Sequence, residues 1–430
     1  MSSTSIILSK KDKLVQGTIH LTGSKSECNR ALIMQALSNG KVKIENVSEA
    51  ADTVTLDAIL NHQLREFGEQ AADAHVVIDV GPAGTAMRFL TAYASLLNGE
   101  FTLTGSARMK QRPIRILVDG LRTLGAEIEY LEEDGYPPMK IKGPLQQKTR
   151  SVSISGEVSS QYITALLLIA PNLPQGLELI IEGELTSRPY VEMTLSMLEQ
   201  AGIRHQWDQQ VITIEHQSFS PSVISIEPDW SAASYWYAIL ALCKEGAELF
   251  LPGLDGYSLQ GDSRITEIMA NFGITSQFRD GGVHLKKEHK ELQRKIFDFH
   301  DCPDLAQTVL VVCAALGHDA TFTGLETLKI KETDRVRALQ TELEKIGVKL
   351  IEKNLTYKLD CSGLNFPERL TIKTYDDHRM AMAFAPLALV VPELEIEDPQ
   401  VVEKSYPHFW KDLQKEGFEI QQAQHLKPNT

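Results

Sequence analysis

The chain has 430 residues, of which 43% are hydrophobic and 23% are charged, a composition typical of globular proteins. At about 150 residues per domain, this length predicts two or three domains and excludes a small disulfide-stapled module. Lys and Arg number 43 against 57 Asp and Glu, which gives a net charge of −14. The field of the whole molecule therefore repels nucleic acids and anionic membranes, and an anionic ligand needs a local cluster of bases.

The cysteines and the apolar runs indicate where the protein works. The five cysteines are widely spaced and include no C-x-x-C pair, which favours neither a disulfide framework nor a zinc knuckle. The N-terminus has three consecutive apolar residues, and the runs around 165–171 and 309–316 are shorter than the ~20 residues of a membrane helix. We therefore expect a cytoplasmic protein that binds no membrane and no nucleic acid and holds no metal.

One kind of helix ending recurs along the chain. An amphipathic stretch stops at a glycine suited to a left-handed cap, and an extended segment follows. The glycines are 70 to 77 residues apart, and a shorter helix from Asp52 to about residue 60 adds one more unit at the N-terminal side. Chance repetition of a common helix ending is the alternative to six copies of a βα unit. We expect an α/β protein of two lobes, each with three units, around a cleft; the glycines are Gly125, Gly202, Gly273, Gly347 and Gly417.

The second unit shows the expected order of elements. Residues 76–80 predict a strand and 81–84 a turn, followed by a helix over 85–97. A second strand over 101–104 and a helix over 113–124, opened by proline, complete the unit.

Two turns rich in small residues lead into predicted helices. In the first, Lys25 and Arg30 lie beside the start of an apolar helix, whose backbone N–H groups and dipole suit a phosphate or carboxylate. In the second, Gly84 would let a ligand approach the backbone. The alternatives are an ordinary solvated helix start for the first turn and a purely geometric need for glycine in the second.

Three further segments of the first half carry polar side chains. Residues 108–112 contain three cations in five residues, which favours an anion clamp on a loop; a solvated basic loop is the alternative. Residues 159–161 and Ser187 directly precede predicted helices. Hydroxyl groups there are usually helix caps, and two such starts could also bind one phosphate together.

In the second half, acids and bases alternate at predicted helix starts. Lys331, Glu332 and Arg335 would supply a cation, a proton-transfer carboxylate and a second cation from one turn. Residues 377–379, Asp-His-Arg, precede an apolar helix, and Asp304 lies in another acidic turn. Each segment taken alone is also compatible with a surface salt-bridge network.

Taken together and in order, these segments resemble the family of 5-enolpyruvylshikimate-3-phosphate synthases, the enolpyruvyl transferases of the shikimate pathway. The resemblance runs from Gly23 to Lys404 and implies a fold of two lobes with three βα units each and the active-site cleft between them. It places the lobe boundaries so that residues 1–20 and 228–430 form one lobe and 21–227 the other. The motifs that carry it are Gly-Ser-Lys-Ser with Asn29-Arg30, Ala-Gly-Thr-Ala-Met-Arg, Arg-Pro-Ile, Ser-Ser-Gln, Ser-Arg-Pro-Tyr, Lys-Glu-Thr-Asp-Arg and Asp-His-Arg-Met-Ala-Met.

The resemblance implies a reaction that leads towards chorismate and the aromatic amino acids. The enolpyruvyl group of phosphoenolpyruvate moves to the 5-hydroxyl of shikimate 3-phosphate, and phosphate is released. Neither a metal nor an organic cofactor is implied, and we expect a monomer that binds only these small molecules.

The resemblance also implies roles for single residues. Asp304 would handle the hydroxyl proton and Glu332 the proton at C3, with a contribution from Lys25. Shikimate 3-phosphate would contact Lys25, Ser26, Arg30, Ser159, Ser160, Gln161, Ser187, Asp304 and Lys331. Phosphoenolpyruvate would contact Lys25, Gly84, Arg112, Gln161, Arg335, Arg379 and Lys404.

Two other functions compete with this interpretation. One is the related UDP-N-acetylglucosamine enolpyruvyl transferase, but that enzyme typically has a reactive cysteine in the loop that corresponds to Ser106–Gln111, which has none here. The other is a non-catalytic two-lobed protein that binds phosphorylated metabolites. Two positions depart from the family's pattern: Pro82 and Thr327 stand where asparagine is found in other members, and Pro82 cannot donate a hydrogen bond.

Overall fold

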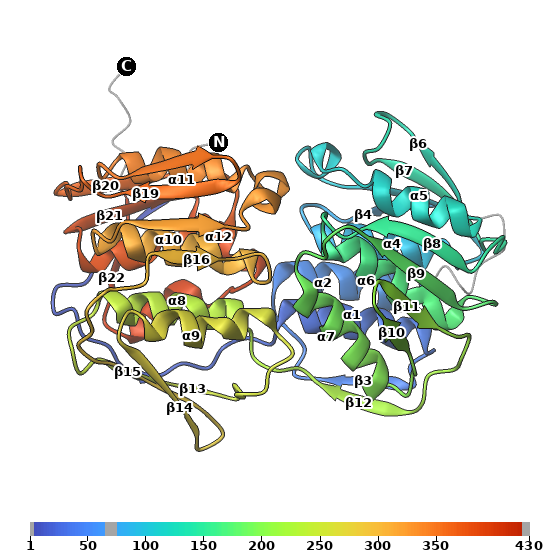
Figure 1. Ribbon diagram of the computed structural model, residues 1–430, viewed down its shortest axis with the longest axis horizontal. Coiled ribbons are helices and arrows are strands. Elements are labelled where there is room, and N and C mark those ends of the chain that lie inside the picture. Colours follow the sequence, from blue (N-terminus) through green and yellow to red (C-terminus); the bar gives the residue numbers. More distant parts are fainter. Residues whose placement is uncertain (1–3, 65–74, 424–430) are drawn as a thin grey trace. The chain divides into compact units, whose positions relative to one another are not determined.

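The computed structural model describes residues 4–64 and 75–423, and the chain divides into two compact units. The first unit consists of Met1–Thr22 with Pro228–Thr430, and the second of Gly23–Glu227. The described strands form six sheets, three in each unit, as six copies of a βα unit predict. Figure 1 shows the elements of both units.

The N-terminal segment completes two sheets of the first unit. Strand β1 (Ser5–Ser9) pairs antiparallel with β21 (Glu393–Glu397) and β22 (Glu419–Gln422), and β2 (Gln16–Thr18) pairs parallel with β13 (Glu248–Pro252). The strand orders are β20-β21-β1-β22, β14-β15-β13-β2 and β16-β17-β19-β18. The other strands are β14 (Ile274–Arg279), β15 (Gly282–Lys287), β16 (Ile296–Asp298), β17 (Ala320–Thr323), β18 (Lys349–Lys353), β19 (Thr356–Asp360) and β20 (Arg369–Ile372).

Buried helices fill the interior of the first unit. Every residue of α10 (Ala306–Ala315) and α12 (His378–Phe384) is buried, and α8 (Trp230–Leu242) is buried along almost its whole length. A helix that is apolar on all faces belongs inside a protein, and these three pack together (Figure 1). The other helices are α9 (Ile265–Ala270), α11 (Arg335–Glu344) and α13 (Phe409–Lys415), with short 3₁₀ turns at Gly261–Arg264, Pro303–Leu305, Glu326–Ile330, Ala385–Leu389 and Pro399–Lys404.

The second unit repeats this plan. Its sheets have the orders β10-β11-β9-β8, β4-β5-β7-β6 and β12-β3. The strands are β3 (Val42–Glu45), β4 (His75–Asp79), β5 (Gly99–Thr104), β6 (Glu127–Tyr130), β7 (Met139–Gly143), β8 (Ser151–Ser155), β9 (Leu177–Glu182), β10 (Gln206–Asp208), β11 (Val211–Ile214) and β12 (Ser222–Ser225). The helices are α1 (Lys25–Leu37), α2 (Ala51–Ala58), α4 (Gly84–Ala94), α5 (Arg115–Leu124), α6 (Ser160–Ile169) and α7 (Arg188–Gln200), with 3₁₀ turns at Met109–Gln111 and Ala170–Asn172.

The predicted glycine endings are confirmed, with φ values between 75° and 119° at all five positions. At Gly125, for example, the left-handed glycine caps α5, whose buried face is formed by leucines and Val118. The elements predicted for the second βα unit are also found, although α4 begins at Gly84 and ends at Ala94. Pro113 does not open α5, because this helix begins at Arg115 after the cap residue Ile114. Helix α2 ends at Ala58, close to the end predicted near residue 60. A π-helix over Ile59–Gln63 follows it directly, which the sequence did not predict.

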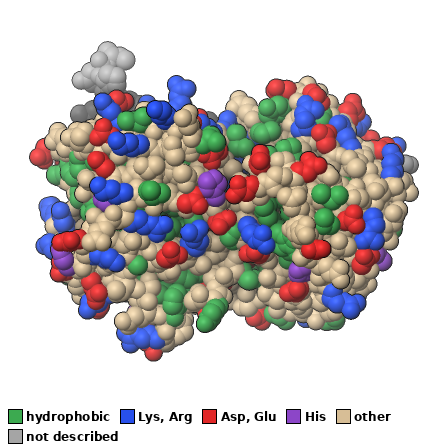
Figure 2. Space-filling view, in the orientation of Figure 1, with side chains coloured by type: hydrophobic (Ala, Val, Ile, Leu, Met, Phe, Trp, Pro, Cys, Tyr) green, Lys and Arg blue, Asp and Glu red, His purple; other side chains and the backbone are tan. Residues whose placement is uncertain are grey.

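The drawn face carries many charged side chains, and the cysteines form no disulfide. Figure 2 shows acidic and basic side chains interspersed on the drawn face, with hydrophobic atoms in small groups between them. All five cysteines are free and buried. None of the described helices is long and apolar enough to cross a membrane.

Candidate active site

In the first unit, a buried arginine joins three carboxylates. Arg335 is the first residue of α11, which is capped by Asp334, and its side chain is 1% exposed. Its Nε lies 2.7 Å from Asp377 Oδ2, while its Nη atoms lie 3.1 Å from Asp304 Oδ1 and 2.8 Å from Glu332 Oε2. Charge-assisted bonds of this length from a rigid guanidinium fix all three acids. The alternative of a surface salt-bridge network is therefore wrong for this segment, because Arg335 and Asp377 are buried and Asp304 and Glu332 are only partly exposed.

A second arginine reaches the same carboxylate from another helix. Arg379 stands in the first turn of α12, where the Asp377 side chain accepts its backbone N–H. Its Nη2 lies 3.1 Å from Asp304 Oδ2, and its Nη1 lies 3.1 Å from the hydroxyl of Tyr235. Burial opposes ionisation of Asp304, but the neighbouring cations, first of all Arg379, hold the pKa of its carboxyl below the usual range. Asp304 is therefore a carboxylate in this state.

Two lysines complete the cluster. Lys331 Nζ lies 3.7 Å from Asp304 Oδ1, and Lys404 Nζ lies 3.4 Å from Glu332 Oε1. The structure thus brings together all six residues that the sequence predicted from this half of the chain. They are Asp304, Lys331, Glu332, Arg335, Arg379 and Lys404.

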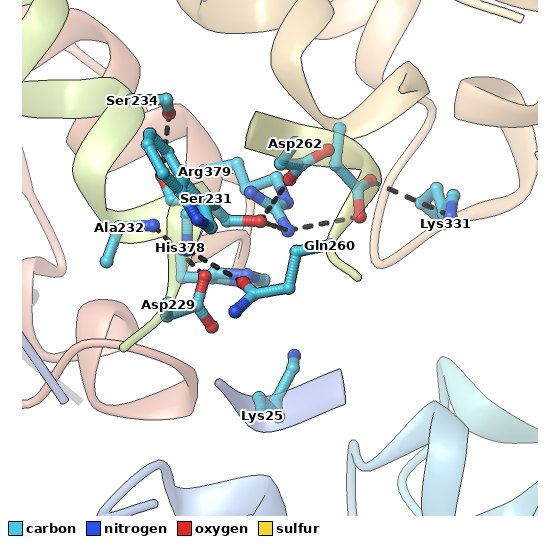
Figure 3. A network of polar contacts seen from close by, with 12 residues as sticks. Lys25, Asp229, Ser231, Ala232, Ser234, Gln260, Asp262, Lys331, His378 and Arg379 are labelled. Atoms are coloured by element: carbon cyan, nitrogen blue, oxygen red, sulfur yellow. Dashed lines mark hydrogen bonds and ion pairs between the residues drawn. The ribbon is translucent and has the colours of Figure 1, made fainter. Parts of the chain in front are cut away.

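The structure adds groups that the sequence did not single out. The Ser231 hydroxyl donates to Asp262 and accepts from Arg379 Nη2 at 3.3 Å (Figure 3). Burial and the negative charge of Asp304 raise the pKa of Asp262 to about 6. Ser231 and Tyr235 come from α8, and nothing local in the sequence of that apolar helix indicates a polar role for them. Asp377, by contrast, was visible as a polar residue before an apolar helix.

In the second unit, a buried arginine joins three helices through uncharged groups. Arg30 on α1 is 3% exposed, and its Nε lies 2.9 Å from Thr194 Oγ1 of α7. Its Nη2 lies 3.3 Å from Thr164 Oγ1 of α6, and its Nη1 lies 2.7 Å from the carbonyl oxygen of Ser26. Burial lowers the pKa of Arg30 to about 10, so that the side chain remains a cation near neutral pH.

Other predicted residues of the second unit stand at the first turns of the same helices. Lys25 begins α1, and its Nζ lies 3.1 Å from Asp52 Oδ2. Ser159 caps α6, as predicted, by accepting from the backbone N–H of Gln161. The Gln161 amide in turn lies 3.4 Å from the hydroxyl of Thr85, in the first turn of α4. Ser26 follows Lys25 on α1, and Ser160 is the first residue of α6.

The capping role predicted as the usual one for Ser187 is wrong. Its φ is 54°, and its side chain caps no N–H group of α7. The preceding Thr186 holds the turn instead, because its backbone N–H and its hydroxyl both donate to the carbonyl of Gly156. A hydroxyl at a helix start that is not used as a cap is available for another role.

The basic loop at residues 108–112 forms no three-cation clamp. Lys110 pairs with Glu132 at 2.8 Å on the surface, and Met109 between the cations is buried. Arg112 is 6% exposed and lies against Gly84. A Cβ at Gly84 would come within 2.6 Å of Arg112 Nη1, so the absence of a side chain there leaves the space that the guanidinium occupies.

The helices of the second unit present their N-termini at one end. Arg30 connects the N-terminal halves of α1, α6 and α7, and the bond between Gln161 and Thr85 adds α4. Unsatisfied N–H groups and the positive ends of the helix dipoles therefore gather beside two cations and several hydroxyls. Such an end suits the phosphate of a ligand.

Comparison with known proteins identifies the family of this chain. The profile of the family described as EPSP synthase (3-phosphoshikimate 1-carboxyvinyltransferase) matches residues 9–413. A 3-phosphoshikimate 1-carboxyvinyltransferase from Bacteroides fragilis (strain YCH46) is 47% identical over 410 residues, which cover 94% of this chain and 96% of that protein. The protein of the same name from Pectobacterium atrosepticum is 36% identical and covers 93% and 96% of the two chains.

Solved structures show the same fold. The EPSP synthase from Acinetobacter baumannii superposes with a TM-score of 0.76 at 20% identity, over 98% of this chain and all of that one. The enolpyruvyl transferase NikO from Streptomyces tendae gives a TM-score of 0.72 at 15% identity, over 98% and 99% of the two chains. The predicted fold class, α/β with two lobes of repeated βα units, is thereby confirmed. The family profile and the 47% identical relative show that this chain belongs to the EPSP synthase (3-phosphoshikimate 1-carboxyvinyltransferase) family.

Proposed function

We propose that this protein transfers the enolpyruvyl group of phosphoenolpyruvate to the 5-hydroxyl of shikimate 3-phosphate and releases phosphate. Family membership supports the reaction, and the buried cluster around Arg335 supports the assignment of groups to it. This is the reaction by which the shikimate pathway proceeds towards chorismate and the aromatic amino acids. In this proposal the protein is a cytoplasmic monomer. Its five cysteines are free and buried, which supports the cytoplasmic location.

The gathering of cations in the cluster supports binding of phosphoenolpyruvate in the first unit. Four cations lie together there, Lys331, Arg335, Arg379 and Lys404, and each contacts a carboxylate of the protein. The carboxylate and phosphate of phosphoenolpyruvate then compete with the protein's own acids for the same cations. From the second unit, Arg112 beside Gly84 binds the same substrate.

The second unit supplies the groups for shikimate 3-phosphate. The helix N-termini, Lys25 and the cation of Arg30 suit the phosphate. The hydroxyls and the amide of Ser26, Ser159, Ser160, Gln161 and Ser187 suit the phosphate oxygens and the ring hydroxyls, because each can donate or accept. Lys25 and Gln161 contact both substrates, and Asp304 and Lys331 from the first unit contact the acceptor.

The addition step removes one proton from the 5-hydroxyl and adds one proton to C3. The oxygen of the 5-hydroxyl attacks C2 of phosphoenolpyruvate, and Asp304 takes the hydroxyl proton. Glu332 gives a proton to C3, which becomes a methyl group, and C2 becomes tetrahedral. When substrate anions draw Arg335 and Lys404 away from Glu332, less positive charge opposes its protonation. Lys25 contributes by neutralising charge that develops at the reacting centre.

Elimination reverses the acid and base roles. Glu332 removes a proton from the methyl group, the C2–C3 double bond forms again, and the C2–O bond to phosphate breaks. The leaving phosphate carries the charge that Arg335, Arg379 and Lys404 neutralise, so side-chain cations do the electrostatic work of this step. The single observation that carries the assignment is that Asp304 and Glu332 are both held by Arg335, within 3.1 Å of its two Nη atoms.

Phosphate release tests the proposed function directly. We expect release in the presence of chelator only when phosphoenolpyruvate and shikimate 3-phosphate are both supplied, with no release when either is omitted. Release with UDP-N-acetylglucosamine as the acceptor, and none with shikimate 3-phosphate, would assign the related transferase activity instead. Binding of both ligands without release would support the non-catalytic alternative.

A further inference from the structure

The turn that leads into α12 has an unusual backbone. The carbonyl of Thr374 accepts the N–H of Asp377 at 2.9 Å, and the two central residues, Tyr375 and Asp376, have φ values of 55° and 54°. A turn with positive φ at both central positions normally contains Asn and Gly there, because other side chains are strained in this conformation. Such strain persists only where the surroundings determine the conformation, and it is common near functional sites.

A buried carboxylate holds this turn. Glu342 of α11 is 0% exposed. Its Oε1 accepts from the Tyr375 hydroxyl at 2.7 Å, and its Oε2 accepts from the backbone N–H of Lys373 at 3.1 Å. Lys345 Nζ lies 2.6 Å from the same carboxylate and supplies the opposite charge. A charged acceptor thus binds the turn on both sides of Thr374.

The same helix is also fastened to the end of the turn. Arg335 precedes Glu342 by seven residues, or about two helical turns, so the two side chains extend from one face of α11. Arg335 binds Asp377 at 2.7 Å, and Asp377 caps α12 through the N–H of Arg379. Two contacts that are two helical turns apart therefore fix how the segment 373–379 lies against α11.

We propose that Glu342 is a positioning residue for enolpyruvyl transfer, which fixes Arg335 and Arg379 relative to each other by holding the turn Thr374–Asp377 through Tyr375. The inference rests on the proposed function, in which both arginines bind phosphoenolpyruvate. Neither Glu342 nor Tyr375 contacts the reacting groups in this assignment. Their effect reaches the substrate through Asp377.

The chemistry of the contact favours this role over simple packing. Tyr375 is only half-buried, so its ring alone does not require the hydroxyl to be paired. Burial and the hydrogen bond to Glu342 raise the pKa of Tyr375 to about 12, so its hydroxyl keeps its proton and donates throughout the physiological range. The hydroxyl therefore remains a donor to Glu342 near neutral pH, at the 2.7 Å distance that holds the turn.

Removal of one hydroxyl tests the proposal. Tyr375→Phe in the full chain is compared with Tyr237→Phe, which removes a buried hydroxyl that lies 2.8 Å from Ser276 Oγ in the same unit. We expect Tyr375→Phe to raise the KM for phosphoenolpyruvate about five- to tenfold and to leave the KM for shikimate 3-phosphate within about twofold. Tyr237→Phe should lower the unfolding midpoint similarly while both KM values stay at the wild-type level.

Several outcomes would overturn the inference. An unchanged KM for phosphoenolpyruvate in Tyr375→Phe would show that the contact serves stability alone. An equal rise of that KM in Tyr237→Phe would show a general response to lost stability. If Tyr375→Phe does not fold, Glu342→Gln decides the comparison, because its neutral amide offers one acceptor oxygen in place of two and holds the turn less strongly. Wild-type protein without phosphate release would overturn the proposed function and this inference together, whereas an active wild type with unaltered variants would overturn this inference alone.

Discussion

The buried arginines Arg335 and Arg30, one in each unit, are held in opposite ways. In the first unit, Arg335 and Arg379 bind the carboxylates of Asp304 and its neighbours. In the second unit, Arg30 is equally buried, but its hydrogen bonds go to threonine hydroxyls and backbone carbonyls. Burial accordingly lowers the pKa of Arg30, whereas the surrounding acids overcome burial and raise the pKa of Arg335.

This difference separates two tasks. A site that transfers protons needs carboxylates close to cations, so that an anionic substrate can redistribute the charge during the reaction. A site that only binds an anion works better with a cation that hydroxyls hold in place, because no protein carboxylate competes with the ligand. The proposed function accordingly has proton transfer in the first unit and recognition of the phosphorylated acceptor mainly in the second.

Loss of a proton-transfer group should have the largest effect. We expect Glu332→Gln to lower kcat by about 10²-fold or more with little change in either KM, because the amide transfers no proton while Arg335 and Lys404 stay in place. Single-turnover and steady-state measurements of phosphate release test this. The matched control is Glu352→Gln, whose carboxylate pairs with Lys329 at the surface of the same unit. Wild-type turnover by Glu332→Gln would assign the C3 proton to another residue.

The buried arginine of the second unit should affect binding and stability together. Arg30→Lys keeps the charge but loses the bonds from Nε and Nη2 to Thr194 and Thr164. We expect the free energy of unfolding to fall by about 2 kcal/mol and the KM for shikimate 3-phosphate to rise about tenfold. Denaturant unfolding and initial rates measure both quantities.

Arg115→Lys is the control for Arg30→Lys. This exposed arginine pairs with Asp134 in the same unit, and such pairs contribute little. If Arg30→Lys raised the KM for phosphoenolpyruvate and left that for shikimate 3-phosphate unchanged, the division of tasks between the units would be wrong.

Much of the fold could be predicted because its signals are local. The helix endings at Gly125 and Gly347 each need a left-handed backbone at one residue, and glycine adopts it most easily. The apolar sequence of α10 indicates burial on every face. Helix starts such as Ser159 were visible for the same reason. The order of the motifs then predicted the family, and the comparisons confirmed this prediction.

The site could be predicted only in part, because its remaining features depend on contacts between distant segments. Whether Arg335 lies on the surface or inside depends on Asp377, 42 residues away in the sequence. The link from Ser231 to Arg379 spans 148 residues. Ser187 looked like a cap, and only the backbone around Gly156 explains why it is not one. Local composition contains no information of this kind.

A smaller effect should appear in the pH dependence of stability. The pKa of Asp262 is raised from 3.8 to about 6, so the folded state binds a proton more tightly than the unfolded state. Its contribution to stability is therefore complete below about pH 4 and is lost as the pH rises through about 6. We expect Asp262→Asn to remove this loss, so that the variant gains stability relative to wild type between these pH values. Urea unfolding at several pH values measures the difference; a constant difference would contradict the raised pKa.

The smallest expected effect concerns a single methyl group in the second unit. A Cβ at Gly84 would lie 2.6 Å from Arg112 Nη1, and the end of a flexible side chain can yield where backbone could not. We therefore expect Gly84→Ala to fold normally, to displace the guanidinium and to raise the KM for phosphoenolpyruvate about three- to fivefold. Gly120→Ala is the matched control, because a Cβ on this helical glycine would meet its nearest neighbours at 3.5 Å, an ordinary contact. The variant should keep the KM for phosphoenolpyruvate, and its free energy of unfolding should rise by up to about 1 kcal/mol from better helix propensity. Initial rates and thermal unfolding of both variants decide the matter. An unchanged KM in Gly84→Ala would mean that Arg112 binds no substrate from its position beside the turn, and phosphoenolpyruvate would then depend on the cations of the first unit.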